Sequence, residues 1–211
     1  MHGMLFDNVH TYDDLNLILS QVDIPPAMVK TNFVDIPGGD GSVDLTEALG
    51  EVKFYDRECS FTFTVFPYEN FEEKKKLISN LLNGKRCRIT LDKDPGFYWV
   101  GRCSVNEYAS DKNLHKIVVG AVVAPYKLKV NVTVATVPPG DAVSQTIVNG
   151  RKSVVPTITN AKTATIVFEG NTFTINPGTH VMSNIVLKQG ANVMQVTSTD
   201  AVTFTYQEGD L

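Results

Sequence analysis

The sequence predicts a mainly β protein built from two domains, with one α-helix in the first domain and a boundary near residue 128. Three observations lead to this prediction. Residues 60–66 alternate largely between apolar and hydroxyl side chains, as a strand with one buried face does. Residues 71–82 place apolar side chains at helical spacing. Beyond Lys129 charged residues become sparse, and short alternating segments follow one another with no helical pattern.

The composition is that of an ordinary globular protein and argues against several classes of partner. Of the 211 residues, 43% are hydrophobic, which is enough to build substantial cores. The net charge is −4, from 19 basic and 23 acidic side chains. This balance does not favour nucleic acid or an anionic membrane surface as a partner. No apolar run approaches the roughly 20 residues of a membrane span, and the first residues lack the pattern of a signal peptide.

The three cysteines predict buried, reduced thiols. Cys59, Cys87 and Cys103 cannot all pair with one another, and none belongs to a CxxC motif. This usage is typical of a protein made in a reducing compartment, and the sequence therefore predicts no disulfide framework.

The first domain is predicted to contain several strands around a glycine turn. Leu15, Leu17 and Leu19 alternate as a strand, which Pro25-Pro26 ends because proline cannot donate to a ladder. The turn Pro37–Gly41 is rich in glycine, which takes left-handed dihedrals at little cost. Further strands are expected at Met28–Val34, Ser60–Phe66, Arg86–Leu91, Phe97–Val105 and Lys116–Ala124, with a hairpin turn at Asp92–Gly96.

One amphipathic helix is predicted over Phe71–Leu82. Asn70 is the expected N-cap, with Glu73 in the position of a capping box, and Asn83-Gly84 is the expected stop. Lys74–Lys76 are expected on a solvated face. The apolar stripe is expected to comprise Phe71, Leu77, Ile78, Leu81 and Leu82.

The second domain is predicted to be an antiparallel β-sandwich. Its turns recur at short intervals, and Glu169-Gly170-Asn171 is the clearest hairpin. The aromatic side chains of this part fall on inward-alternating positions and are expected in the core: Phe168, Phe173, Phe204 and Tyr206. Strands are expected at Val130–Val137, Ser144–Val148, Thr157–Ile158, Thr163–Phe168, Thr172–Ile175, Asn184–Leu187, Val193–Thr197 and Val202–Tyr206.

No pattern in the sequence indicates catalysis, a cofactor or a metal. The four histidines are scattered and lack metal-ligand spacing: His2, His10, His115 and His180. Asp40 and Asp44 lack the alternating oxygen ligands and the closing glutamate of a calcium loop. The segment Gly38–Ser42 lacks the lysine and following hydroxyl residue of a phosphate loop. We therefore expect a protein that is not an enzyme, with no catalytic, cofactor-binding or metal-binding residues.

Several segments, in order, resemble the distal tail protein family of long-tailed bacteriophages (siphophages). These are Tyr12–Leu15 with Leu17–Leu19, Ile36–Gly41 with Val43–Thr46, Tyr55 and Arg57 before the Phe61–Val65 strand, the helix Phe71–Leu82, and Leu187, Gly190–Asn192 and Tyr206–Leu211 at the end. The likeness covers nearly the whole chain and depends on the order of these motifs.

The resemblance implies a β-sandwich with one helix over residues 1–128, which closes into a six-membered ring, and a galectin-like β-sandwich over residues 129–211. It implies a structural hub of a phage or prophage tail, located in the tail tip or baseplate of the virion and assembled in the cytoplasm of the bacterial host. The implied partners are other copies of the chain, the tail tube protein, and the tail-tip, baseplate and tail-associated proteins. Nucleic acid and membrane are not among them.

Two expectations about sites follow. The glycine turn is the candidate for contact with a neighbouring subunit, through Pro37, Gly38, Gly39, Asp40 and Gly41. The alternative function is carbohydrate binding through the second β-sandwich, as in a lectin. Larger relatives carry carbohydrate-binding insertions in this domain. Because only about 80 residues are available here, we expect no inserted sugar-binding module.

Overall fold

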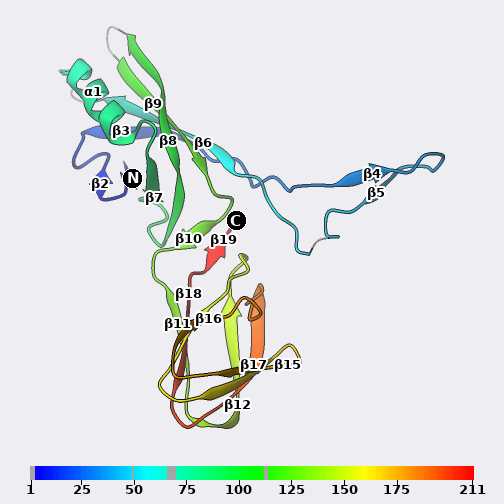
Figure 1. The fold of residues 1–211 in the computed structure, drawn as a ribbon. Helices are drawn as coiled ribbons and strands as arrows, with labels where there is room; N and C mark the ends of the chain where they lie inside the picture. Colours follow the sequence, from blue (N-terminus) through cyan, green and yellow to red (C-terminus); the bar gives the residue numbers. More distant parts are fainter. Residues whose placement is uncertain (1–2, 49, 66–69, 112–113) are drawn as a thin grey trace. The chain divides into compact units, whose positions relative to one another are not determined.

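A computed structural model describes residues 3–48, 50–65, 70–111 and 114–211 (Figure 1). These residues form strands through most of their length, together with one helix, α1 (Phe71–Leu82). The prediction of a mainly β protein with one helix is confirmed. The chain divides into two compact units, residues 1–127 (unit 1) and 128–211 (unit 2). In the described ranges no helix is long and apolar enough to cross a membrane.

Unit 1 is built on a continuous antiparallel sheet. Seven of its strands are hydrogen-bonded in the order β2-β1-β7-β8-β9-β6-β3. The strands are β1 (Met4–Phe6), β2 (Val9–His10), β3 (Leu17–Asp23), β6 (Arg57–Val65), β7 (Arg86–Leu91), β8 (Phe97–Asp111) and β9 (Leu114–Val123). A separate hairpin joins β4 (Phe33–Asp35) to β5 (Ser42–Asp44).

The sheet of unit 1 folds back on itself. Three strands, β7, β8 and β9, separate β1 from β6 in the sheet order. In a flat sheet β1 and β6 would lie about 19 Å apart, four times the strand spacing. Instead, the ring centroid of Phe6 on β1 lies 6.4 Å from the centroids of both Phe61 and Phe63 on β6. The two halves of one sheet therefore face each other and enclose the core, which gives the sandwich that the family resemblance implied.

Strand β6 supplies the centre of this core. Phe61, Phe63 and Val65 are at most 1% exposed, whereas Thr62 and Thr64 between them are only half-buried. This confirms the alternation that the sequence predicted for the segment. Phe66, the expected last residue of the strand, lies outside the described residues.

The predicted side-chain cap of α1 is wrong. Asn70 precedes the helix with φ of 68°, in the left-handed region, and its side chain forms no capping hydrogen bond. A left-handed N-cap turns the side chain away from the first free N–H groups, because a capping residue needs extended dihedrals. At the other end the Asn83 N–H donates to the Ser79 carbonyl, and Gly84 takes φ of 77°, so the predicted glycine stop is confirmed.

The buried face of α1 is narrower than predicted. Phe71, Ile78 and Leu82 are buried, but Leu77 is 49% exposed. Leu77 precedes Ile78 by one residue, and one residue corresponds to about 100° around a helix, so Leu77 lies off the buried face. The lysines on the opposite side are also not simply solvated. Lys75 packs over the rings of Phe71 and Tyr108 and pairs with Glu72 at 2.6 Å.

Unit 2 is a sandwich of two antiparallel four-stranded sheets around one core. Side chains of both sheets, such as Ile158 and Phe204 from one and Ile166 and Val196 from the other, belong to a single buried cluster. One sheet has the order β11 (Thr133–Val137), β18 (Val202–Tyr206), β13 (Thr157–Asn160), β16 (Gly178–Val181). The other has the order β12 (Gly140–Asn149), β17 (Gly190–Ser198), β14 (Ala164–Phe168), β15 (Asn171–Ile175). The short strands β10 (Lys127–Lys129) and β19 (Gly209–Asp210) pair with each other.

The predicted β14–β15 hairpin is confirmed. Phe168 pairs with Asn171, and the two residues between them, Glu169 and Gly170, have φ of 49° and 77°. Two consecutive positive φ values define the type I′ turn, which matches the twist of a tight hairpin. The aromatic residues are also placed as predicted: Phe168, Phe204 and Tyr206 are buried, and Phe173 packs against the core.

Two strand predictions in unit 2 differ from the structure. The expected strand Asn184–Leu187 forms only an isolated bridge between Val154 and Leu187. Strand β16 was missed because Pro177-Gly178 indicates a turn. This strand lies at the edge of its sheet and is largely exposed, so it carries little of the alternation that marks a strand with one buried face.

The three cysteines are free and buried, as predicted. Burial is the main cause that raises the pKa of the Cys59 thiol to about 11 and that of Cys103 to about 12. The neighbouring Cys87 raises the pKa of Cys103 further. All three thiols are therefore protonated and unreactive at neutral pH.

These pKa shifts predict a loss of stability in alkali. A thiol whose pKa is higher in the folded chain than in the unfolded chain stabilises the fold fully below the unfolded pKa. That stabilisation declines as the pH rises toward the folded pKa. We expect the free energy of unfolding in urea to fall above about pH 9, by up to about 1.4 kcal/mol per pH unit for each thiol. The Cys103→Ala variant should show a shallower decline, and equal slopes for the two proteins would contradict this origin.

Arg57 is a buried cation with few partners. Its side chain is 7% exposed, and its Nη1 donates to the Pro25 carbonyl at 3.4 Å. Its Nε and Nη2 atoms are buried and have no hydrogen-bond partner among the described residues. Burial lowers the pKa of this guanidinium. A buried charge without partners destabilises a fold, because the hydration that it loses is not replaced.

Replacement of Arg57 by an apolar side chain of similar length is expected to stabilise unit 1. Arg57→Met removes the desolvation cost and keeps the packing volume, so we expect a gain of about 1 kcal/mol or more in unfolding free energy. Arg57→Lys, which keeps the charge and loses donors, serves as the control and should not stabilise. Chemical denaturation of the three proteins measures the difference, and a destabilised Arg57→Met variant would refute the prediction.

Candidate functional site

The histidines that could serve catalysis are used within the fold. His115 stacks on Phe71 with ring centroids 4.4 Å apart and contacts the Ser110 hydroxyl at 2.8 Å. His180 Nε2 donates to the Asn176 carbonyl at 2.7 Å. His2 lies outside the described residues. Within the described ranges, no group of three or more histidine, cysteine, aspartate or glutamate residues is arranged to hold a metal ion.

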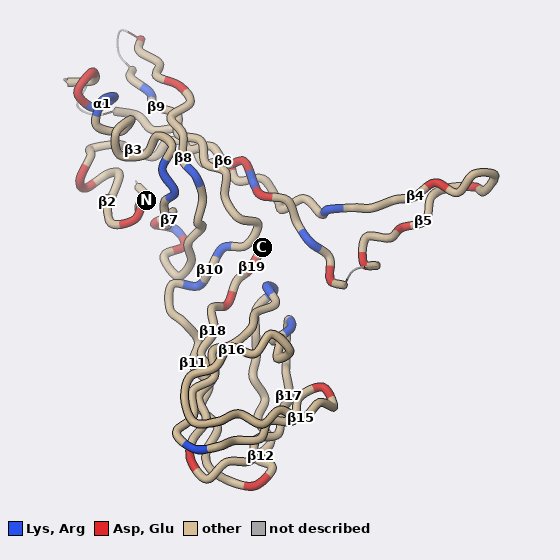
Figure 2. The backbone as a smooth tube through the Cα atoms, in the orientation of Figure 1, with Lys and Arg blue, Asp and Glu red and all other residues tan. Residues whose placement is uncertain are grey.

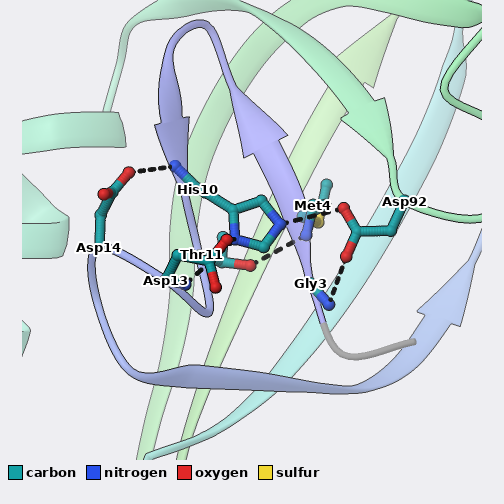
Figure 3. A network of polar contacts seen from close by, with 7 residues as sticks. All are labelled: Gly3, Met4, His10, Thr11, Asp13, Asp14 and Asp92. Carbon is teal, nitrogen blue, oxygen red and sulfur yellow. Dashed lines mark hydrogen bonds and ion pairs between the residues drawn. The ribbon is translucent and has the colours of Figure 1, made fainter.

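His10 belongs to the most developed polar network of unit 1 (Figure 3). Its Nε2 lies 3.0 Å from Asp92 Oδ1, and the other oxygen of Asp92 accepts the Gly3 N–H at 3.0 Å. Its Nδ1 faces the backbone N–H of Asp13 at 3.1 Å and the Asp13 carboxylate at 2.9 Å. Both ring nitrogens are therefore engaged within the chain.

The His10–Asp92 pair has the geometry of a base and its orienting carboxylate, but no hydroxyl or thiol of the described residues is hydrogen-bonded to the His10 ring. The nearby Thr11 hydroxyl is 1% exposed and accepts the Met4 N–H at 3.0 Å. A Cβ atom on Gly3 would lie only 2.7 Å from the His10 ring, so residue 3 packs closely beneath it. We assign the network to structure: it ties the residues around β1 and β2 to the turn between β7 and β8.

The most unusual element of unit 1 is a long arm, residues 24–48 and 50–56, that leaves the sheet between β3 and β6 (Figure 1). Its two runs are held together near its base by the Lys30 N–H, which donates to the Lys53 carbonyl, and by the Tyr55 N–H, which donates to the Met28 carbonyl. Farther out, β4 and β5 form its hairpin. The arm has no buried core of its own, because its described side chains are exposed or at most half-buried.

The predicted contact residues form the tip of this arm. The Gly39 N–H donates to the Ile36 carbonyl at 3.0 Å, which closes a turn with Pro37 and Gly38 at its centre. Gly38 has φ of 80°, and proline followed by glycine with positive φ is the signature of a type II turn. Gly41 also has positive φ, 75°. The structure thus brings Pro37–Gly41 together at one exposed tip, and their contact with a neighbour stays a prediction.

The sequence analysis missed the apolar surface of the arm. Phe33 is 58% exposed and Ile36 is 56% exposed, which is unusual for side chains of this size. The large apolar side chains exposed along the arm are Met28, Val29, Phe33, Val34, Ile36, Val43, Leu45 and Tyr55. Exposed apolar side chains gathered along one segment are typical of protein–protein interaction surfaces.

The outer part of the arm is also strongly acidic. Between residues 33 and 52 there is no lysine, arginine or histidine. Figure 2 shows acidic residues and no basic ones along β4 and β5. The acidic residues of this stretch are Asp35, Asp40, Asp44, Glu47 and Glu51. The arm therefore presents apolar and anionic groups together.

A hollow of about 650 Å³ lies on the outer face of the unit 1 sheet. We call it the arginine groove, because Arg86 from β7 and Arg102 from β8 line it. Its other lining residues include Asp56, Gly84, Val100 and Val122. The groove therefore combines two cations and one carboxylate with apolar side chains.

A second hollow, on the unit 2 sandwich, is lined by small polar residues, among them Asp141, Thr163, Thr165 and Thr197. Lectin sites usually add an exposed aromatic platform to such polar groups. The large apolar side chains exposed on the described part of unit 2 are aliphatic, for example Val148 and Val193. No observation on the described residues therefore favours the lectin alternative.

Comparison with solved structures gives a match over nearly the whole chain. No protein-family model matches the chain, and no curated protein matches it. Among solved structures, the crystal structure of the Dit protein (gp 19.1) of phage SPP1 matches with a TM-score of 0.72 and 17% sequence identity. The match covers 98% of this chain and 99% of the SPP1 chain. The SPP1 protein is described as a paradigm of the hub of the adsorption apparatus in phages that infect Gram-positive bacteria. At the level of fold, the chain thus has the architecture of the distal tail protein over its whole length, as its motifs predicted.

Proposed function

We propose that the chain is a structural hub of a phage or prophage tail, which joins the tail tube to the tail tip and the host-adsorption apparatus. The observation that carries this proposal is the fold match to SPP1 Dit, which covers 98% of this chain and 99% of the SPP1 chain. A match confined to one sandwich would be weak support, because β-sandwiches serve many functions. A match to the whole two-unit architecture is far more specific.

In this proposal the chain acts without catalysis, through its surfaces. Its partners are further copies of itself, the tail tube protein, and the tail-tip, baseplate and tail-associated proteins, with neither nucleic acid nor membrane among them. It assembles in the cytoplasm of the bacterial host and stays in the virion. The use of both His10 ring nitrogens within the fold supports a non-catalytic role.

We further propose that six copies close into a ring through unit 1. The arm supports this step, because a long apolar segment without a core of its own gains stability only when it is covered. A contact between an arm and a different surface of the next copy is heterologous, and such contacts generate a closed ring when the rotation is correct.

The location of the protein in the particle tests the hub function. Particles produced by a host that carries this gene should be labelled at the tail tip by antibodies against the chain. Deletion of the gene should leave capsids and tubes without adsorption-competent tails. Antibody labelling of the head, or wild-type tails without this chain, would overturn the proposal.

The tip of the arm is expected to matter for assembly more than for folding. Gly38→Val with Gly41→Val forces β-branched side chains into positive φ, at a cost of about 1–3 kcal/mol each, and so distorts the hairpin. We expect sedimentation velocity to show fewer or no rings, while thermal unfolding of unit 2 stays unchanged.

Gly96→Val is the matched control for this experiment. Gly96 also lies in an exposed turn with open space around its Cβ position, but it does not have positive φ. This variant should assemble like the wild type. Intact rings from the Gly38→Val and Gly41→Val double variant would refute the role of the tip.

A further inference from the structure

The arginine groove contains a like-charged pair that forms no ion pair with a described residue, and the Asp56 carboxylate lines the same hollow. Arg86 and Arg102 are direct partners across β7 and β8, which places their Cβ atoms about 4.5–5.5 Å apart. Like charges at this distance destabilise a strand pair. Arg102 Nη1 donates to the Gly84 carbonyl at 2.6 Å. Neither guanidinium lies within ion-pair distance of a carboxylate in the described parts of the chain.

The surroundings of the pair suit an extended segment that is both acidic and apolar. Both arginines are exposed, and Val122, which pairs with Arg102 from β9, is 49% exposed. A guanidinium binds carboxylates through two parallel hydrogen bonds, and the apolar side chains beside it would be covered in the same contact. Figure 2 shows basic positions in the region of β7 and β8, and the strand register pairs Arg86 with Arg102.

The β4–β5 hairpin of the arm has the complementary pattern. Phe33 pairs with Asp44, and Asp35 pairs with Ser42, so both carboxylates lie on the same face of the hairpin as Phe33. Diagonal neighbours of this kind are about 7–8 Å apart, within the reach of two arginine side chains. Neither carboxylate forms an ion pair with a described residue.

We propose that Asp35 and Asp44 of one copy bind Arg86 and Arg102 of the next copy, with Phe33 covering Val122. This contact depends on the proposed ring and specifies which surface receives the arm. The occupant is a second copy because the acidic, apolar hairpin and the basic groove belong to the same chain, and their charges form no ion pair within its described parts. The Asp44 carboxylate accepts the Thr46 N–H at 2.9 Å. Since the two surfaces differ, the contact is heterologous and orients every copy in the same direction around the ring.

Charge reversal and exchange test this contact. Arg86→Glu with Arg102→Glu (the groove variant) and Asp35→Lys with Asp44→Lys (the arm variant) each place like charges in the interface. We expect each variant alone to associate at least about tenfold more weakly than the wild type, as measured by sedimentation velocity over a range of concentrations. Wild-type association should also weaken as salt is raised.

Restoration is the decisive part of the experiment. In an equimolar mixture, alternation of the groove and arm variants around the ring restores opposite charges in every contact. One chain that carries all four substitutions restores them as well. We expect both samples to associate within about threefold of the wild type. A loss that comes from misfolding would not be restored by mixing, so this comparison separates recognition from folding.

Lys93→Glu with Lys116→Glu is the matched control. It changes the net charge by the same amount as the groove variant, through exposed residues that do not line the groove. This variant should associate like the wild type. The contact is overturned by a wild type that stays monomeric at all concentrations, by a groove or arm variant that associates normally, or by a mixture that does not recover.

The results also distinguish this contact from the hub function. Labelling of the tail tip together with failed charge exchange would keep the hub and refute the arm–groove contact. Successful charge exchange without labelling of the tail would keep the contact and refute the hub.

Discussion

The packing of Phe6 against Phe61 and Phe63 is the contact on which unit 1 depends. These rings come from opposite halves of one sheet, and their proximity requires the sheet to fold over. A folded sheet has an enclosed face, which buries the alternating side chains of β6, and an outer face, which carries Arg86 and Arg102. The burial of a large aromatic side chain contributes about 2–3 kcal/mol, so this small cluster stabilises much of the unit.

The arm, in contrast, has no buried core. Its described side chains are exposed or at most half-buried. A two-stranded hairpin is marginally stable alone in water, and β4–β5 consists of three residue pairs. Large apolar side chains such as Phe33 and Ile36 remain exposed there. In the proposed assembly, this exposed apolar area becomes an interface, which removes its cost in the isolated chain.

The way in which this chain could recognise a charged partner depends on where its charges lie more than on its net charge. The net charge of −4 is close to balanced and favours no charged partner. Yet residues 33–52 contain only acidic charges, while Arg86 and Arg102 stand side by side on the sheet. Segregated charges of this kind give an interface its orientation and its specificity. They also make its affinity sensitive to salt, because exposed ion pairs are screened.

The sequence alone determined the features that depend on neighbours along the chain. These include the alternation of β6, the Glu169-Gly170 turn, the glycine stop of α1 and the turn at Pro37–Gly41, since local dihedrals and side-chain period set them. Tertiary structure decided the rest. The fold of the sheet, the exposed edge strand β16 and the pairing of Arg86 with Arg102 depend on which distant strands meet, and no local pattern records that choice.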